Sequence, residues 1–205
     1  MSLRNEPREP SNNAATRNTY NWQSWYNFVK QGTKAISSAN PDVLILISGL
    51  SYDTTLTPVV QNTALTPGTG KFNLADFPAN KIVLELHNYE TTATNCNTLQ
   101  GNLNRNGFDA LSGTTPNVFP VMLTEFGFQM DATTWRNTYS TCLASFVTAQ
   151  KAGWMIWVLA GSYYIRSGKQ DYDEGWGLMN HDWSDWRSPS YVNGLLVSMV
   201  KGTLN

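Results

Sequence analysis

The sequence has few of the residues that build metal and redox sites. It contains two cysteines, Cys96 and Cys142, and two histidines, His87 and His181. No Cys-x-x-Cys pair occurs, so a zinc site would need an unusual set of ligands. The cysteines leave two interpretations open, one disulfide in an oxidising compartment or two buried thiols in a reducing one. We therefore expect no metal and no cofactor.

The sequence also lacks an excess of charge of either sign. It carries 14 Lys and Arg against 15 Asp and Glu, and no basic run. Binding to nucleic acid or to an anionic membrane depends on clustered positive charge, so we expect neither partner. There is no run of 18 apolar residues and no signal-like apolar stretch near Met1.

Aromatic residues, in contrast, are abundant. They make up 12% of the chain and include eight tryptophans. Five of these lie toward the C-terminus: Trp154, Trp157, Trp176, Trp183 and Trp186. Some must fill the core, but flat apolar rings with a polar edge also stack on sugar rings. The composition therefore mildly favours a carbohydrate ligand.

Four short apolar runs predict the strands of the fold. They begin at Val43, Lys81, Val118 and Trp154, at nearly equal intervals, and read VLILIS, KIVLELH, VFPVMLTE and WMIWVLAG. Almost continuous apolar strands, each followed by enough chain for a crossover, are typical of parallel strands buried on both faces. The pattern predicts a β/α repeat rather than a sandwich.

The segments between these runs differ in their helical character. Apolar residues at helical spacing predict helices over residues 22–36 and 135–146, and a final helix after Pro189. Residues 54–78 are rich in Thr, Pro and Gly, which predicts a long loop with at most a short helix.

The opening residues MSLRN are predicted to form a first short strand, which gives five strands in all. A barrel of eight β/α units takes ~250 residues, and an open arc of five would leave two unpaired edges. We therefore expect an α/β fold of the (β/α)8 TIM-barrel type that is incomplete, with about five of eight units present. Residues 1–205 would form a single partial domain.

Functional groups of parallel β/α folds gather at the carboxyl ends of the strands. Two of the predicted ends carry a glutamate, Glu6 in Asn5-Glu6-Pro7 and Glu125 in Thr124-Glu125-Phe126. Two carboxyl groups across a barrel mouth suit glycoside hydrolysis, in which one protonates the leaving oxygen while the other attacks the anomeric carbon. Either glutamate alone could equally be a solvated loop residue.

The third strand ends in a second group of polar residues. Alternation along a strand places Glu85, His87 and Tyr89 on one face. Tyr89 would bond the nucleophile, and Glu85 would hold the imidazole of His87, although an internal histidine with a purely structural role fits the pattern too. Trp157, after the last strand, would either floor a sugar subsite or fill the barrel.

Other motifs are weaker. GLSYD from Gly49 lacks the closing glycine of a nucleophile elbow, and GTGKF from Gly68 lacks the hydroxyl residue of a phosphate loop, so both are interpreted as loop composition. Asp171, Asp173 and Glu174 offer oxygen ligands for calcium, but clustered acids in a loop are usually only solvated.

The set Asn5-Glu6-Pro7, His87-x-Tyr89, Glu125-Phe126-Gly127 and Trp157 resembles glycoside hydrolase family 5, and most of all its fungal cellulase-type members. The resemblance covers the whole chain in order. It implies that Glu6 is the acid/base, Glu125 the nucleophile and Asn5 a ligand of the sugar 2-hydroxyl. His87 and Tyr89 would line the same subsite, Trp157 would form its floor, and Tyr163, Tyr164 and Trp176 would form outer subsites.

The resemblance has further implications. The family's acid/base ends the fourth strand of eight, whereas Glu6 ends the first here, so we expect a C-terminal portion of the barrel that is weak or inactive alone. A secreted, extracellular protein, monomeric at full length, is implied, and with it a Cys96–Cys142 disulfide. The substrate would be a β-linked glucan polysaccharide or oligosaccharide. A non-catalytic carbohydrate-binding half-barrel, or a hydrolase of mannan or xylan, stays open as an alternative.

Overall fold

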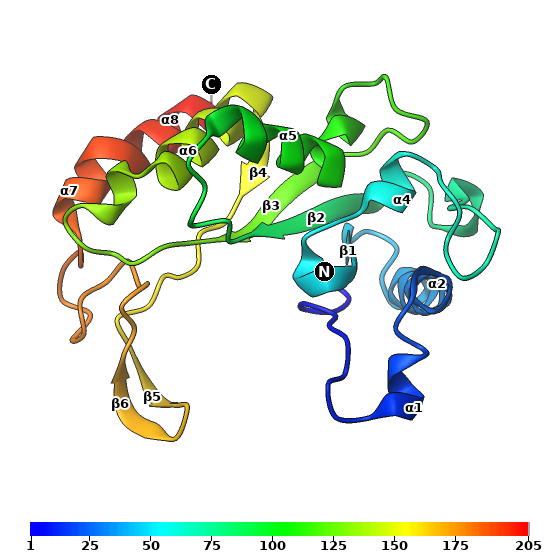
Figure 1. The fold of residues 1–205 in the computed structure, drawn as a ribbon, viewed down its shortest axis with the longest axis horizontal. Helices are drawn as coiled ribbons and strands as arrows, with labels where there is room; N and C mark the ends of the chain where they lie inside the picture. Colours follow the sequence, from blue (N-terminus) through cyan, green and yellow to red (C-terminus); the bar gives the residue numbers. More distant parts are fainter. Residues whose placement is uncertain (205) are drawn as a thin grey trace. The chain divides into compact units, whose positions relative to one another are not determined.

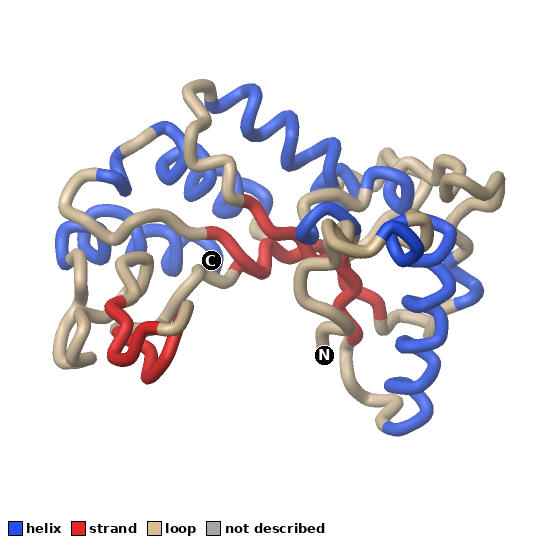
Figure 2. The backbone as a smooth tube through the Cα atoms, turned by 60° about the horizontal axis from the view of Figure 1, so that its bottom comes forward, coloured by secondary structure: helices blue, strands red, loops and turns tan. Residues whose placement is uncertain are grey.

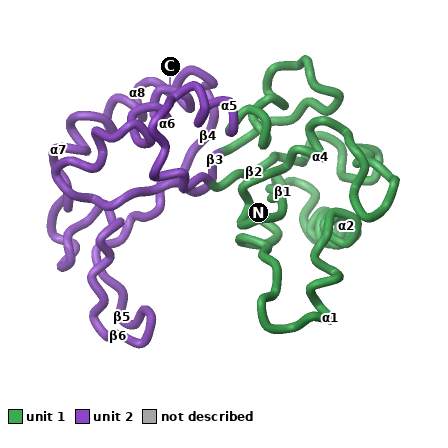
Figure 3. The backbone as a smooth tube through the Cα atoms, in the orientation of Figure 1, with its two compact units in different colours: residues 1–87, 103–122 green, residues 88–102, 123–205 purple. Residues whose placement is uncertain are grey.

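The computed structural model describes residues 1–204 (Figure 1). The chain divides into two compact units, coloured separately in Figure 3. Unit 1 comprises residues 1–87 and 103–122, and unit 2 comprises residues 88–102 and the described chain from residue 123 onward.

One sheet has a strand order that follows the chain, β1-β2-β3-β4. Its strands, red in Figure 2 together with a separate hairpin, are β1 (Ile45–Ser48), β2 (Ile82–Asn88), β3 (Val121–Phe126) and β4 (Gly153–Trp154). β1 and β2 pair in parallel, with Ile45 opposite Ile82. Every residue of β2 is buried, as expected for a strand covered on both faces. The first three apolar runs therefore form the predicted strands of an incomplete (β/α)8 fold, whereas the run from Trp154 contributes only the two-residue strand β4 and continues as irregular chain.

Helices and single turns connect the strands. Unit 1 contains α1 (Ala14–Arg17), α2 (Trp22–Ala39), α3 (Leu50–Asp53), α4 (Thr57–Val60), η1 (Leu74–Asp76) and η2 (Phe108–Leu111). Unit 2 contains η3 (Thr134–Arg136), α6 (Thr138–Gln150), α7 (Pro189–Tyr191), the π-helix η4 (Val192–Leu196) and α8 (Val197–Leu204). Helix α5 (Cys96–Asn106) contributes residues to both units.

Helix α2 begins at the predicted residue, Trp22, and ends three residues beyond the predicted range of 22–36. The Asn21 side chain caps it by accepting the amide of Ser24, and it ends at Ala39 because a residue before proline, here Asn40, disfavours helical backbone. Its buried face carries Trp25, whose Nε1 donates to the Ser48 carbonyl at 2.7 Å. This bond joins α2 to the end of β1.

The long loop of residues 54–78 supplies apolar side chains to the core of unit 1, although it contains only α4 and η1. Phe72 and Phe77 stack with ring centroids 4.6 Å apart, and Tyr26 of α2 contacts both edge-on. The Tyr26 hydroxyl donates to Asp76 at 2.6 Å, where Lys30 also forms an ion pair. The predicted loop is therefore irregular in backbone but well packed.

The predicted first strand is wrong in extent. Residues 1–3 form one isolated parallel bridge, Ser2 to Leu46, and not a regular strand. The Leu46 amide donates to the Met1 carbonyl at 2.9 Å, and the Leu3 amide donates to the Leu46 carbonyl at 3.4 Å. The segment reaches the edge of β1 over too few residues to continue the ladder.

Helices α6 and α8 lie side by side in unit 2 (Figures 1 and 2). Gly202 permits their close approach, because a Cβ atom there would lie 2.4 Å from the Thr148 methyl group. In the same unit, the ring of Phe128 packs edge-on against that of Tyr191 in α7, with ring centroids 5.2 Å apart. These contacts confirm both predicted C-terminal helices.

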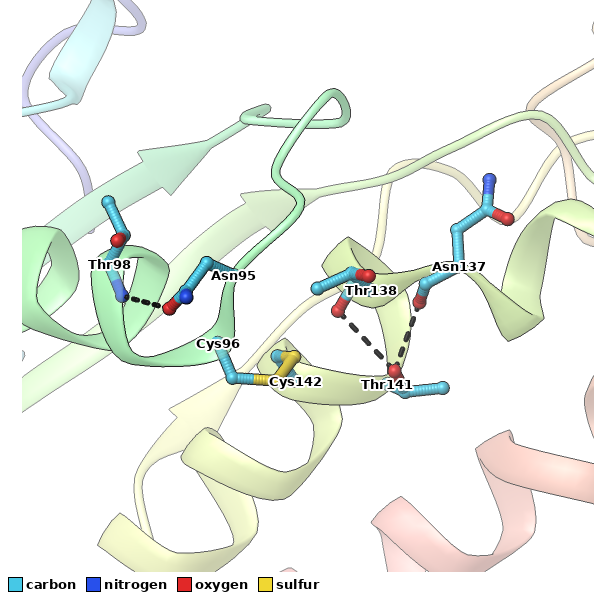
Figure 4. Close-up of a disulfide and its surroundings, with 7 residues drawn as sticks. All are labelled: Asn95, Cys96, Thr98, Asn137, Thr138, Thr141 and Cys142. Carbon is cyan, nitrogen blue, oxygen red and sulfur yellow. Dashed lines mark hydrogen bonds between the residues drawn. A yellow bond between two sulfur atoms is a disulfide. The ribbon is translucent and has the colours of Figure 1, made fainter.

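A disulfide joins Cys96 to Cys142, the pairing that the family resemblance implied (Figure 4). Cys142 is buried on α6, as predicted. Cys96 is the first residue of α5. Beside it, the amide of Thr98 donates to Asn95 Oδ1 at 3.1 Å. The bridge therefore ties two helices of unit 2 together.

A two-stranded hairpin follows the sheet and was not predicted. Strands β5 (Ser162–Arg166) and β6 (Lys169–Asp173) pair antiparallel, with Tyr163 opposite Tyr172. Ser167 and Gly168 connect them with φ values of 53° and 75°, which is the left-handed geometry of a type I′ turn.

Among residues 1–204, no helix combines the length and the apolar character needed to span a bilayer.

Candidate active site

Glu6 lies in an irregular segment of unit 1 that follows the bridge to β1. Its backbone is left-handed, with φ of 46°, which is uncommon for a residue with a side chain. The carboxylate is 21% exposed, and Oε1 lies 3.1 Å from Nδ1 of His87. The backbone amide donates to Oδ2 of Asp53 at 2.8 Å. Side chain and backbone of Glu6 are therefore each held by a different buried residue.

Asp53 belongs to a strained turn at the end of β1. The segment labelled α3 is a left-handed turn, with φ of 55° at Ser51, 61° at Tyr52 and 59° at Asp53. Left-handed backbone costs about 1 kcal/mol or more per residue with a side chain. The interpretation of GLSYD as loop composition was therefore incomplete, because the stretch is an ordered turn that ends in a buried acid.

The turn is joined to the Glu6 segment through Pro7. The Tyr52 amide donates to the Pro7 carbonyl at 3.0 Å. The Tyr20 hydroxyl accepts the Ser51 amide at 2.6 Å and donates to the same carbonyl at 3.0 Å. These bonds offset part of the strain by satisfying polar groups that the turn leaves unpaired.

The electrostatics around Glu6 centre on Asp53, which is 1% exposed. Burial raises the pKa of its carboxyl group to about 6. The Glu6 amide, the Ser48 hydroxyl and His87 oppose this increase, and the nearby carboxylate of Glu85 adds to it. Asp53 therefore changes charge in the mildly acidic range, where most aspartates are fully ionised.

Glu85 makes one contact that its sequence pattern does not predict. Its Oε1 accepts a hydrogen bond from the Ser2 hydroxyl, and the carboxylate of Asp53 lies 3.7 Å from Nε2 of His87. Glu85 lies two residues before His87 on β2 and shares its strand face. That Glu85 also holds the imidazole stays a prediction.

Asn5, the predicted ligand of a sugar hydroxyl, precedes Glu6 and is exposed. Its position beside Glu6 follows from the sequence, and its role stays a prediction.

Glu125 occupies a regular position in unit 2. It is the second-to-last residue of β3 and half-buried, and its Oε2 accepts a hydrogen bond from the Tyr89 hydroxyl at 2.9 Å. A phenol donor stabilises the ionised form of a carboxylate. The predicted contact between Tyr89 and this glutamate is confirmed.

Gly127 and Trp157 lie just beyond Glu125. A Cβ atom on Gly127 would lie 2.4 Å from the Trp157 carbonyl oxygen, so only glycine permits this approach. The Trp157 amide donates to the Phe126 carbonyl at 2.7 Å. The Trp157 ring is half-buried and does not belong to the core of the unit. Its exposure is therefore more consistent with the floor of a sugar subsite than with a residue that fills the barrel.

Arg166 organises the aromatic residues of the hairpin. Its guanidinium lies 5.7, 4.9 and 5.8 Å from the rings of Trp157, Tyr163 and Tyr172. It also pairs with Glu174, which is buried and accepts the Trp176 amide at 3.1 Å. Cation–π contacts and this ion pair hold the rings together. The ring centroids of Trp176 and Tyr89 are 5.9 Å apart.

Tyr164, a predicted outer-subsite residue, is 82% exposed on the hairpin.

The acids considered for calcium lie on or next to β6 and not in an open loop. Each contacts a basic side chain of unit 2, Asp171 with His181, Asp173 with Arg187, and Glu174 with Arg166. These carboxylates thus form ion pairs within unit 2, where the sequence favoured acids that are only solvated over a calcium site.

A sheet whose strands follow the chain order and are connected by helices defines the class of β/α-barrel proteins. The chain belongs to the cellulase family, glycosyl hydrolase family 5, whose family model matches residues 1–162. The family resemblance drawn from the strand-end residues is thus confirmed.

Individual relatives agree. A glycosyl hydrolase 5 family protein from Chamaecyparis obtusa is 33% identical over 209 residues, covering 95% of this chain and 34% of that protein. A β-glucanase structure from Saccharophagus degradans matches with a TM-score of 0.67 at 15% identity, covering 98% of this chain and 53% of the other. The endoglucanase catalytic domain from Xanthomonas campestris pv. campestris matches with a TM-score of 0.59 at 20% identity, covering 96% and 53%. The chain thus spans about a third of the curated relative and about half of the solved structures.

Proposed function

We propose that the protein is a retaining glycoside hydrolase that cleaves β-linked glucans, with Glu6 as acid/base and Glu125 as nucleophile. Family membership supports the reaction class. The observation that carries the residue assignment is the hydrogen bond from Tyr89 to Glu125, because a nucleophilic carboxylate must stay ionised and a fixed phenol donor favours that form.

In the first step, a carboxylate oxygen of Glu125 bonds to the anomeric carbon while the glycosidic bond breaks. The Glu6 carboxyl group gives its proton to the departing oxygen. In the second step, the ionised Glu6 takes a proton from water, the water oxygen bonds to the anomeric carbon, and the ester to Glu125 breaks. Two inversions give net retention, which requires carboxyl groups about 5 to 5.5 Å apart.

The remaining site residues would bind the sugar. Asn5 would contact the 2-hydroxyl, His87 and Tyr89 would line the subsite, and Trp157 would stack beneath the ring. Tyr163 and Trp176, which belong to the Arg166 cluster, would contribute outer subsites. Half-buried rings held in place by neighbouring side chains suit sugar stacking because their apolar faces need not reorganise on binding.

A glucan is the proposed substrate class because structural relatives were solved with glucose oligomers. The β-glucanase from Saccharophagus degradans was crystallised in complex with cellotetraose, and the structure of a protein named XacCel5A was solved in complex with cellopentaose. The disulfide in unit 2 is also consistent with an extracellular protein.

Glu6→Gln and Glu125→Gln test the assignment. Both variants should lose turnover of an aryl β-cellobioside while binding cello-oligosaccharides with an affinity close to that of the unsubstituted protein, measured by calorimetry. Unchanged turnover in either variant would contradict the assignment. Sugar binding without turnover in the longer parent chain would instead identify a carbohydrate-binding protein, and faster turnover of mannan or xylan oligosaccharides would replace the glucan.

A further inference from the structure

Asp53 makes contacts that exceed the needs of a turn residue. Its Oδ2 accepts the amide of Glu6 at 2.8 Å and lies 3.7 Å from Nε2 of His87. Nδ1 on the other side of the same imidazole lies 3.1 Å from the Glu6 carboxylate. Asp53 therefore reaches Glu6 twice, directly at its backbone and through His87 at its side chain.

We propose that Asp53 is a positioning residue for the acid/base reaction: it fixes the left-handed backbone of Glu6 and the imidazole that contacts the Glu6 carboxylate. The proposal rests on the proposed role of Glu6 as acid/base. Asp53 touches no substrate in it and acts only through Glu6 and His87.

The backbone part of the argument comes from the turn. Glu6 and the three residues Ser51, Tyr52 and Asp53 all adopt left-handed backbone. Residues in this region persist only where their surroundings over-determine them, and such positions concentrate at functional sites. Here the two strained segments hold each other, through the bond between Asp53 and the Glu6 amide and through the Pro7 carbonyl. Neither segment retains its geometry without the other.

The choice of an acid, where an amide would accept the same bond, is the second part. Burying Asp53 is costly, as its pKa of about 6 indicates, and the groups that face it are Glu6, His87, Glu85 and Ser48. Glu85 makes the burial worse, whereas a neutral Asn would avoid the cost. An ionised Asp53 adds what Asn lacks, an attraction for the His87 ring that keeps the imidazole against Glu6.

A purely structural role for Asp53 would lower stability and slow all substrates equally. A positioning role predicts a dependence on the leaving group. General-acid assistance matters for a phenyl leaving group and little for a dinitrophenyl group, which departs without a proton. A misplaced Glu6 therefore slows the phenyl glycoside selectively.

The direct test is amide hydrogen exchange at Glu6 in the full chain. Asp53→Ala removes the acceptor, so exchange at this amide should accelerate about tenfold, as for the loss of one hydrogen bond. Asp53→Asn keeps an acceptor oxygen and should leave the exchange rate close to that of the unsubstituted protein. Unchanged exchange in Asp53→Ala would overturn the proposal, and the measurement needs no catalytic activity.

The kinetic test compares phenyl and dinitrophenyl β-cellobiosides. In Asp53→Ala, kcat/KM should fall about tenfold further for the phenyl substrate than for the dinitrophenyl substrate. Asp76→Asn is the matched control, because Asp76 is also an acid of unit 1 that bonds a tyrosine and pairs with a lysine, away from the Glu6 segment. It should change both substrates equally.

Glu6→Gln separates the acid/base role of Glu6 from the positioning role of Asp53. A selective loss on the phenyl substrate in Glu6→Gln but not in Asp53→Ala or Asp53→Asn would overturn the role of Asp53 alone. An absence of selectivity in Glu6→Gln would contradict the acid/base assignment itself, while the exchange measurement would still decide whether Asp53 holds the Glu6 backbone.

Discussion

Glu6 lies in an irregular, left-handed segment of unit 1, whereas Glu125 lies near the end of a regular strand in unit 2. The Glu6 backbone is held by a buried acid and its carboxylate contacts a histidine, whereas the Glu125 carboxylate accepts a hydrogen bond from a tyrosine hydroxyl. In the proposed reaction Glu6 must release and regain a proton, and Glu125 must stay ionised. The two carboxyl groups are therefore positioned by different means, an irregular backbone fixed by side chains for Glu6 and a regular strand with a phenol donor for Glu125.

Removal of the nucleophile should give the largest effect. Glu125→Ala should lower kcat on an activated aryl β-cellobioside by about 10⁴-fold, because no other group forms the covalent bond. Azide should restore part of the rate by attacking from the vacated side and give an α-glycosyl azide, identified by NMR. A β-glycosyl azide from this variant would mean that the roles of the two glutamates are exchanged.

Removal of the disulfide tests whether the region of α5 and α6 is stabilised independently of the Asp53 turn that holds Glu6. Replacing Cys96 and Cys142 by Ser should lower the free energy of unfolding by about 4 kcal/mol, because the bridge closes a loop between residues 46 apart in sequence. Amide exchange should accelerate in α5 and α6 and not in the Asp53 turn. Equal acceleration throughout residues 1–204 would show that the two regions do not differ in this respect.

The charge of Asp53 makes unit 1 sensitive to pH. The pKa of Asp53 is about 6 in the folded protein and near its ordinary value of 3.8 when unfolded, so the folded state binds more protons between these values. Its contribution to stability is therefore present at low pH and is lost as the pH rises from about 4 through about 6.

Asp53→Asn should abolish this loss. The variant should be more stable than the unsubstituted protein by about 3 kcal/mol at pH 7.5 and nearly equal to it at pH 4, both measured by urea unfolding. A difference in stability that does not change with pH would contradict the raised pKa of Asp53.

Loss of the phenol donor should have the smallest effect. Tyr89→Phe removes only the hydrogen bond to Glu125 and should lower kcat/KM by about tenfold for phenyl and dinitrophenyl substrates alike. A fall in kcat/KM for the phenyl substrate alone would contradict the distinction between the two glutamates, because Tyr89 would then assist the acid/base and not the nucleophile.

Much of this fold is predictable because its strands are buried on both faces. Continuous apolar runs mark β1, β2 and β3 clearly, and helical periodicity marks α2 and α6. Helix α5 was missed because only Leu99 and Leu103 bury apolar surface on it, too few for a clear period. The β5–β6 hairpin did carry a signal, the Ser167-Gly168 pair between tyrosine-rich segments.

The candidate site is predictable where strand ends fix it and not elsewhere. Glu125, Tyr89 and His87 follow from strand position and alternation. Asp53 does not, because three consecutive left-handed residues without glycine contradict local backbone preference, and no sequence pattern predicts them. Arg166 was missed, and Glu174 was considered only as a calcium ligand, because their pairing depends on the unpredicted hairpin.

The most direct test of the proposed mechanism is covalent labelling with a 2-deoxy-2-fluoro β-cellobioside that carries a dinitrophenyl leaving group. The fluorine slows hydrolysis of the intermediate, so mass spectrometry should find one fluorosugar on the peptide that contains Glu125, and none in Glu125→Gln. A label on any other residue, or rapid turnover with inverted configuration and no label, would contradict the account.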